Sequence, residues 1–313
     1  MSATHLPDYA GGSIVNLMQS IATACGSTSS PYPSLPALSA VQLGRARHIV
    51  LLVIDGLGQR TLARHASSPH LQHHLLGSMT SVFPSTTASA ITTFMTGLAP
   101  AQHGLTGWHM HLDEIDQTLA ILPLTPRLGP SRLSPAALPA RLFEHPSLFQ
   151  RLDRECWVVA PQSIVGSAFN AWHSRAAQTR AYNSVAEMFA CLGELLQETT
   201  RSRYVYAYYP DLDSCSHHYG TDSRQAQQTL SAVDTLFGEL LRKLRGSNTW
   251  VLLTADHGFI DSPPRRVISL DDHPQLAALL LRPLCGERRV AYCYVASANR
   301  PVFEDYVRRH LAR

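Results

Sequence analysis

The sequence predicts an α/β fold with a central, mostly parallel sheet and helices on both of its faces. Short apolar runs rich in β-branched residues alternate along the chain with stretches that have helical spacing of apolar positions. Acidic residues directly follow several of these runs, and ligands of parallel sheets bind outside the carboxyl ends of the strands. Of the 313 residues 45% are hydrophobic and 16% charged, which excludes a disordered protein.

In the first third of the chain, apolar spacing predicts a helix over 13–24, and a proline-rich loop follows over 31–36. The run HIVLLVI over 48–54 is short, continuous and β-branched, which is typical of a strand buried on both faces. A second strand is expected over 79–83. After Pro84 we expect a helix over 87–96 that ends at Gly97, because glycine commonly follows a helix C-terminus.

Residues 104–149 have a different character. They are rich in proline, leucine and histidine and show no clear period. We therefore expect a single domain over 1–313 with an insertion or cap at 104–149, beside the functional site.

Alternation then resumes to the end of the chain. Strands are expected over 156–160, 203–209, 250–254 and 289–295, and helices over 184–198, 221–244 and 301–311. The longest of these helices carries an apolar stripe at Ala226, Leu230, Val233, Phe237, Leu240 and Leu244.

Charge and cysteine usage limit the possible partners. A net charge of +3 is too small to indicate a nucleic-acid polymer or an acidic membrane surface as partner. The six cysteines form no CxxC pair, and the first ten residues do not resemble a signal peptide. No apolar run reaches the roughly 18 residues of a membrane span. The sequence thus predicts a cytoplasmic protein and leaves its oligomeric state open.

Acidic and histidine side chains follow three of the expected strands. Asp55, Asp213 and Asp256 lie just past strand ends, His217 stands four residues after Asp213, and His257 follows Asp256. Aspartate and histidine are ligands that a divalent metal such as zinc accepts. Two metals about 4 Å apart can hold both the attacking and the leaving oxygen of a phosphoryl transfer. We therefore expect a two-metal site at this edge of the sheet.

Each of these residues also has a plain structural interpretation. Asp55 before Gly56 could form a turn or cap the next helix. Asp213 and His217 could share one face of a helix, or lie in a loop that wraps an ion or merely faces solvent. Asp256 and His257 give the sharpest signal, because a buried strand delivers both of them into a glycine-containing turn.

A serine- and threonine-rich stretch over 85–89 stands at an expected strand-to-helix turn. A helix N-terminus gathers unpaired N–H groups, where a phosphate oxygen could bind. The alternative is ordinary capping of the helix by these hydroxyls.

Four motifs occur in one order along the chain: VIDGLG (53–58), FPSTTASAITTFMTGLAPAQHG (83–104), YYPDLDSCSHHYG (208–220) and TADHGF (254–259). With them the sequence resembles the type I phosphodiesterase/nucleotide pyrophosphatase family of the alkaline phosphatase superfamily. The resemblance implies an alkaline phosphatase-like sheet, two zinc-type ions and a covalent phosphothreonine intermediate. By ligand chemistry alone, mixed aspartate and histidine sites suit zinc, but manganese or iron could occupy them.

The resemblance also implies roles for individual residues. Thr87 would be the nucleophile, with Thr86 as a neighbouring alternative. Asp55, Asp256, His257 and the Thr87 oxygen would hold one metal. Asp213 and His217 would begin the other site, where Asp211 competes with Asp213. For the further histidine that the family uses, His273 is the candidate, unless the chain lacks this ligand.

The resulting hypothesis is a metal-dependent phosphoester hydrolase that acts on a small phosphoester or nucleotide through Thr87. A phosphonate hydrolase of the same fold is the first alternative. A sulfatase is disfavoured, because Thr87 stands where that class needs a cysteine or serine. A catalytically weak metal-binding domain is a further alternative, which two departures from the family pattern keep open: the uncertain third histidine, and Ala90 where family diesterases have asparagine.

Overall fold

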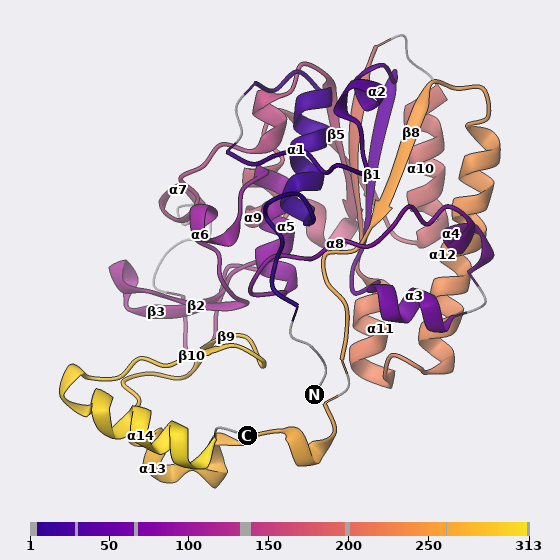
Figure 1. Ribbon diagram of the computed structural model, residues 1–313. Coiled ribbons are helices and arrows are strands. Elements are labelled where there is room, and N and C mark those ends of the chain that lie inside the picture. The colour runs from indigo at the N-terminus through magenta and orange to yellow at the C-terminus, as the bar shows by residue number, and fades with distance from the viewer. Residues whose placement is uncertain are drawn as a thin grey trace.

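The computed structural model describes residues 5–28, 31–65, 68–131, 139–197, 201–260 and 262–311. Its centre is a sheet of five parallel strands in the order β6-β5-β7-β1-β8, with helices on both faces (Figure 1). The predicted fold class is thereby confirmed. The strands are β1 (His48–Ile54), β5 (Glu155–Pro161), β6 (Ala177–Tyr182), β7 (Arg203–Tyr209) and β8 (Thr249–Thr254).

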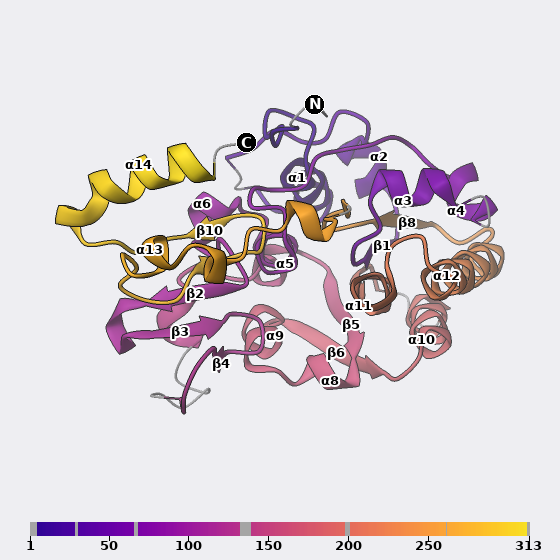
Figure 2. The same ribbon diagram turned by 90° about the horizontal axis from the view of Figure 1, so that it is seen from below.

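Strand β1 is buried along its whole length, as its unbroken apolar run predicted. Ile49, Leu51 and Val53 pack with residues of the helices on one face, while Val50 and Leu52 pack with those on the other. Helices α1, α5 and α9 cover the first face and α10 and α12 the second (Figures 1 and 2). Two apolar cores thus hold the sheet between them.

Most of the helices are short, and several predicted ones have nearly the expected ends. The longer α-helices are α1 (Ile14–Ala24), α5 (Thr87–Thr96), α10 (Val185–Gln197), α11 (Asp211–Tyr219), α12 (Arg224–Lys243) and α14 (Arg300–His310). The shorter ones are α2 (Ala40–Gly44), α3 (Gln59–Arg64), α4 (Pro69–His73), α6 (Pro100–His103), α7 (Pro139–Leu142), α8 (Gln162–Val165), α9 (Ala168–His173) and α13 (Pro274–Ala277). Residue 198, the predicted end of the helix over 184–198, lies outside the described residues.

The segment over 79–83 does not form the predicted strand. Within it only Thr80 makes a β-bridge, to Ser13. The Thr80 N–H donates to the Gly12 carbonyl (2.8 Å), and the Ile14 N–H donates to the Thr80 carbonyl (3.0 Å). The segment therefore pairs briefly with the N-terminal part of the chain instead of joining the sheet. Strand β6, conversely, was not predicted. It is a largely exposed edge strand, and its polar sequence AQTRAY lacks the apolar run by which the other strands were recognised.

A second, antiparallel sheet was also not predicted. It has the order β10-β9-β2-β3-β4. Three of its strands come from the aperiodic segment over 104–149: β2 (His109–Leu112), β3 (Gln117–Ala120) and β4 (Thr125–Pro126). The other two, β9 (Cys285–Gly286) and β10 (Ala291–Tyr292), come from near the C-terminus. The strand predicted over 289–295 is thus much shorter and belongs to this sheet.

The second sheet lies on the side of the molecule toward which the strands of the main sheet point (Figure 1). It depends on close backbone contact, because a Cβ at Gly107 would come within 2.7 Å of Gly286 Cα. Gly286 itself has φ +83°, in the left-handed region that favours glycine. The part of this segment around Gly107 and β2 is therefore joined to the C-terminal part of the chain.

Within the described part of the chain, none of the helices combines the length and the apolar character that crossing a membrane requires.

Candidate metal centre

Asp55 follows β1 and begins the loop at the carboxyl end of the sheet. Its side chain is only 2% exposed. Tyr208 Oη donates a hydrogen bond of 2.5 Å to its Oδ2. The next residue, Gly56, has φ +74°, and a Cβ there would lie 3.3 Å from Asp213 Cα and even closer to the Phe259 ring. Glycine thus lets this loop approach the segments that carry the other acidic and histidine side chains.

Asp256 and His257 follow β8, which is the parallel neighbour of β1. Asp256 is fully buried, and its Oδ1 accepts the backbone N–H groups of Gly56 (3.1 Å) and His257 (2.8 Å). Through this oxygen Asp256 connects the loop after β1 with the loop after β8. Its second oxygen, Oδ2, lies 3.5 Å from His257 Nε2.

Asp213 and His217 lie on α11, which starts directly after β7. Of the two arrangements that the spacing allowed, the helical one is observed. His217 Nε2 is 3.5 Å from Asp213 Oδ1, as expected for side chains four residues apart on one helical face. Asp211, the sequence alternative to Asp213, is exposed at the start of the same helix.

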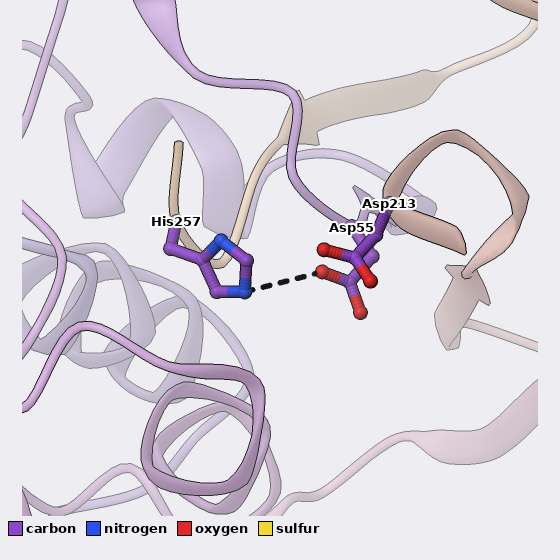
Figure 3. Close-up of side chains that lie close together, drawn as sticks. All are labelled: Asp55, Asp213 and His257. Carbon is purple, nitrogen blue, oxygen red and sulfur yellow. Dashed lines mark ion pairs between the residues drawn. The ribbon is translucent and has the colours of Figure 1, made fainter. Parts of the chain in front are cut away.

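These segments bring Asp55, Asp213 and His257 together. One ligand atom of each lies within 4.8 Å of the others. In Figure 3 the His257 ring faces the two carboxylates, and the dashed line marks the 3.4 Å between His257 Nε2 and Asp55 Oδ1. Residues separated by about 200 positions in the sequence thus form one compact group of oxygen and nitrogen ligands.

The group fits a divalent cation. Asp55 Oδ1, Asp213 Oδ1 and Asp256 Oδ2 are buried oxygens that accept no hydrogen bond from any described residue. A buried carboxylate oxygen left in this way is costly unless a cation or proton compensates it. Burial, together with the neighbouring carboxylates, raises the pKa of Asp55 well above its usual range and that of Asp213 to about 6. Burial likewise raises the pKa of Asp256 to about 6. The fold therefore gathers negative charge that a metal would neutralise.

Thr87 is the first residue of α5 and points at this cluster. Its Oγ1 lies 3.1 Å from His257 Nε2 and 3.5 Å from Asp55 Oδ2. The neighbouring Thr86 instead donates to Glu287 Oε1 at 2.7 Å. The structure thus places the Thr87 hydroxyl, and not that of Thr86, beside the candidate ligands.

Besides Asp256 and Thr87, which both contact His257, two further predicted ligands lie outside the compact group. His217 has a side chain 62% exposed and stacks edge-on against Phe259, with ring centroids 5.0 Å apart. His273 lies before α13, where its Nδ1 is 3.0 Å from Tyr306 Oη, and both ribbon views show α13 well away from α11 (Figures 1 and 2). His217 borders the cluster through Asp213, and the assignment of His273 as a ligand stays a prediction.

Sequence reasoning missed two residues at the site, Tyr208 and Glu287. Tyr208 lies in the strand RYVYAYY, whose apolar and aromatic pattern predicts only a buried core residue at this position. Its hydroxyl reaches Asp55 because β7 pairs with β1. Glu287 lies in a segment without a periodic signal and contacts Thr86 across 201 residues of sequence.

Fold and site together define an α/β protein with a candidate metal centre of acidic and histidine side chains at the carboxyl ends of a parallel sheet. A family model described as type I phosphodiesterase/nucleotide pyrophosphatase matches residues 49–121 and 145–308. The chain therefore belongs to this family of hydrolases, as the motifs predicted.

Individual relatives match over shorter segments. An uncharacterized pyrophosphatase/phosphodiesterase of Schizosaccharomyces pombe is 26% identical over 152 residues, 42% of this chain and 31% of that protein. The bis(5'-adenosyl)-triphosphatase of Pongo abelii is 31% identical over 87 residues, 25% of this chain and 19% of that protein. The matches thus span a third or less of these curated relatives.

The fold is shared with murine ectonucleotide pyrophosphatase/phosphodiesterase 5. That structure has a TM-score of 0.60 and 19% sequence identity, and the match covers 82% of this chain and 68% of that one. At this level of identity the similarity establishes the fold.

Proposed function

We propose that this protein is a metal-dependent phosphoester hydrolase with Thr87 as nucleophile and a small nucleotide or phosphodiester as substrate. The observation that carries the proposal is the position of Thr87 Oγ1, 3.1 Å from His257 Nε2 and beside the carboxylate of Asp55. A threonine hydroxyl is a poor nucleophile unless its pKa is lowered or a base takes its proton. In this protein the Thr87 hydroxyl lies next to His257 and Asp55, which can accept its proton or hold a metal that lowers its pKa.

Asp55, Asp256 and His257, with the Thr87 oxygen, are the proposed ligands of one ion, and Asp213 with His217 those of a second. The compact group contains ligands from both sets, so the two proposed sites adjoin. Two ions in such sites, typically about 4 Å apart, can hold the attacking and the leaving oxygen of a phosphoryl transfer. When bound, such ions would polarise the phosphoryl group and lower the pKa of the threonine hydroxyl. Mixed aspartate and histidine ligands suit zinc, and manganese is the alternative.

The proposed reaction has two displacements. Thr87 Oγ1 forms a bond to phosphorus while the bond from phosphorus to the leaving oxygen breaks, and the threonine proton passes through solvent to the leaving oxygen. Water then forms a bond to phosphorus, the Thr87 oxygen–phosphorus bond breaks, and the threonine regains a proton. No redox partner is needed, because every step exchanges an oxygen on phosphorus.

The start of α5 supplies a place for the phosphoryl oxygens. Among the described residues, none accepts a hydrogen bond from the backbone N–H of Ala88 or Ser89. Free N–H groups in the first helical turn attract an anion through hydrogen bonds and the helix dipole. An oxygen of a phosphoryl group attacked by Thr87 would lie next to these N–H groups.

The names of the relatives support a nucleotide substrate. One is a bis(5'-adenosyl)-triphosphatase, and the murine structure was also determined as an inactive threonine-to-alanine form in complex with AMP. We further propose that the second sheet is the cap of a single catalytic domain and contacts the leaving group. A cytoplasmic location stays a prediction of the sequence.

The test is the initial rate on bis(p-nitrophenyl) phosphate and p-nitrophenyl phosphate after chelation and after return of zinc or manganese. We expect metal-restored turnover, and the ratio of the two rates distinguishes a diesterase from a monoesterase. Thr87→Ala should reduce kcat on the order of 1,000-fold or more, since a covalent step is lost. Full metal-dependent turnover by Thr87→Ala would exclude the covalent route.

Asp213→Asn and Asp211→Asn form a matched pair for the metal requirement. Both remove one negative charge from the first turn of α11, but only Asp213 belongs to the ligand group. We expect Asp213→Asn to need far more metal for turnover, whereas Asp211→Asn should respond to metal like the wild type. Equal behaviour of the two variants would contradict the ligand assignment.

A further inference from the structure

Glu287 joins three parts of the molecule beside the candidate nucleophile. It lies in the turn between β9 and β10, near the C-terminus. Its Oε1 accepts hydrogen bonds from Thr86 Oγ1 (2.7 Å) and from the backbone N–H of Trp108, just before β2. One carboxylate oxygen thus connects the second sheet to the residue that directly precedes Thr87.

The bond to Glu287 gives Thr86 an unusual role for a helix N-cap. A serine or threonine at this position normally accepts the N–H of the second or third helical residue. The Thr86 hydroxyl makes no such bond, although Thr86 has the extended backbone of an N-cap. At the start of α2, α9 and α12, by contrast, the N-cap serine does accept an N–H group: Ser39 from Gln42, Ser167 from Asn170 and Ser223 from Ala226.

The diverted hydroxyl leaves the start of α5 uncapped. The N–H groups of Ala88 and Ser89 accordingly have no acceptor among the described residues. If Thr86 were released from Glu287, rotation about its Cα–Cβ bond would bring the hydroxyl back toward these N–H groups. A hydroxyl in that position would compete with a phosphoryl oxygen for the same donors.

We propose that Glu287 is a positioning residue, which holds the Thr86 hydroxyl away from the start of α5 so that its N–H groups can bind the phosphoryl group of the substrate. This inference rests on the proposed function and deepens it. It assigns the C-terminal β9–β10 turn to the active site, although the turn contains none of the proposed metal ligands.

The experiment compares Glu287→Ala, Thr86→Val, the double variant and Glu287→Gln with the wild type on bis(p-nitrophenyl) phosphate. Glu287→Ala should lower kcat/KM by about 10- to 100-fold, since small displacements near the reacting group have effects of this size. Glu287→Gln should keep most activity, because its amide oxygen can accept the same two bonds. Thr86→Val is the reference for the double variant.

The double variant separates positioning from mere structural support. Without a hydroxyl at position 86 no side chain can cap α5, so the double variant should be at least about tenfold more active than Glu287→Ala. Its melting temperature should fall below that of Glu287→Ala, because the newly formed cap is lost again. Activity and stability should therefore change in opposite directions.

The outcomes also separate this inference from the function on which it rests. A double variant no more active than Glu287→Ala would overturn the inference and leave Glu287 as an anchor of the hairpin. Glu287→Gln as impaired as Glu287→Ala would overturn it as well. If wild-type protein shows no metal-dependent turnover, the proposed function falls and the inference with it.

Discussion

At the scale of single residues, the site includes a tyrosine hydroxyl to which the sequence motifs assigned no role. Tyr208 is buried and donates to Asp55 Oδ2, which helps to keep that carboxylate ionised against the effect of burial on its pKa. Two positions earlier on β7, the equally buried Tyr206 has a hydroxyl without a hydrogen-bond partner among the described residues. The two tyrosines differ chiefly in whether their hydroxyls meet a carboxylate.

We predict opposite effects of removing these two hydroxyls. Tyr208→Phe should lower the free energy of unfolding by about 1–3 kcal/mol, because a buried acceptor loses its partner. It should also weaken metal binding by about tenfold, as is common for groups that support a ligand. Tyr206→Phe should leave stability equal or slightly higher. Urea unfolding and metal titration of both variants check this, and equal losses would contradict the assigned role.

The sequence was sufficient for residues that stand directly after a strand. Asp55, Asp256 and His257 were predicted because an apolar run places them at a sheet edge, and the structure brings them together. Tyr208 could not be found in this way, because its role depends on the register that sets Val53 beside it on β1. When the role of a side chain depends on which strand lies beside it, the local sequence around that residue does not indicate the role.

At the scale of elements, two glycines let the loops after β1 and β8 touch. A Cβ at Gly58 would lie 2.6 Å from Gly258 Cα, which is closer than real contacts allow. The loops carry Asp55 on one side and Asp256 and His257 on the other. Their separation therefore controls how near the proposed ligands can come.

We predict that Gly58→Ala will impair the site without removing a ligand. The added methyl group should push the two loops apart and lower metal affinity on the order of 10- to 100-fold. The control is Gly193→Ala within α10, where a Cβ would meet nothing within 4 Å. That change should raise the free energy of unfolding by roughly 0.5–1 kcal/mol and leave metal affinity unchanged. Wild-type metal affinity in Gly58→Ala would refute this account.

Elements were predictable where their own residues decide their structure. Strands β1 and β7 have the predicted bounds, because each is a continuous apolar run buried on both faces. The second sheet was not predictable, because its strands have two to four residues and one pairing joins His109 to Gly286. Such strands are stabilised by distant partners and not by local pattern.

At the scale of the whole molecule, buried histidines make the fold sensitive to acid. Burial lowers the pKa of His103 to about 3 and that of His173 to about 4. His103 Nδ1 accepts the Leu105 N–H at 3.1 Å, so this nitrogen carries no proton in the folded protein. The ring of His173 packs against Phe143 and Phe169, with ring centroids 4.4 and 4.1 Å away.

We predict that these histidines destabilise the fold as pH falls from about 6.5 to about 4. In this window the unfolded chain binds protons that the folded chain does not, so their contribution to stability rises with pH. In the metal-free protein Asp213 and Asp256, whose pKa values are raised to about 6, contribute with the opposite sign between about 4 and 6. The histidine effect must therefore be read as a difference between variants.

His173→Phe isolates this difference. The slope of unfolding free energy against pH should be smaller than in the wild type, by at most about 1.4 kcal/mol per pH unit for one proton. His218→Gln, on an exposed position of α11, controls for the loss of an imidazole. Identical slopes for wild type and His173→Phe between pH 4.5 and 6.5 would contradict the prediction.

The second sheet also determines the order in which this molecule can be completed during synthesis. Strands β2 to β4 leave the ribosome long before β9 and β10, and loop closure over some 170 residues is slow. A nascent chain that extends a few residues past β8 already contains Asp55, Thr87, Asp213, Asp256 and His257, yet it lacks Glu287. The second sheet can thus be completed only after β9 and β10 are synthesised, so the growing chain contains its candidate metal ligands before the proposed active site can be complete.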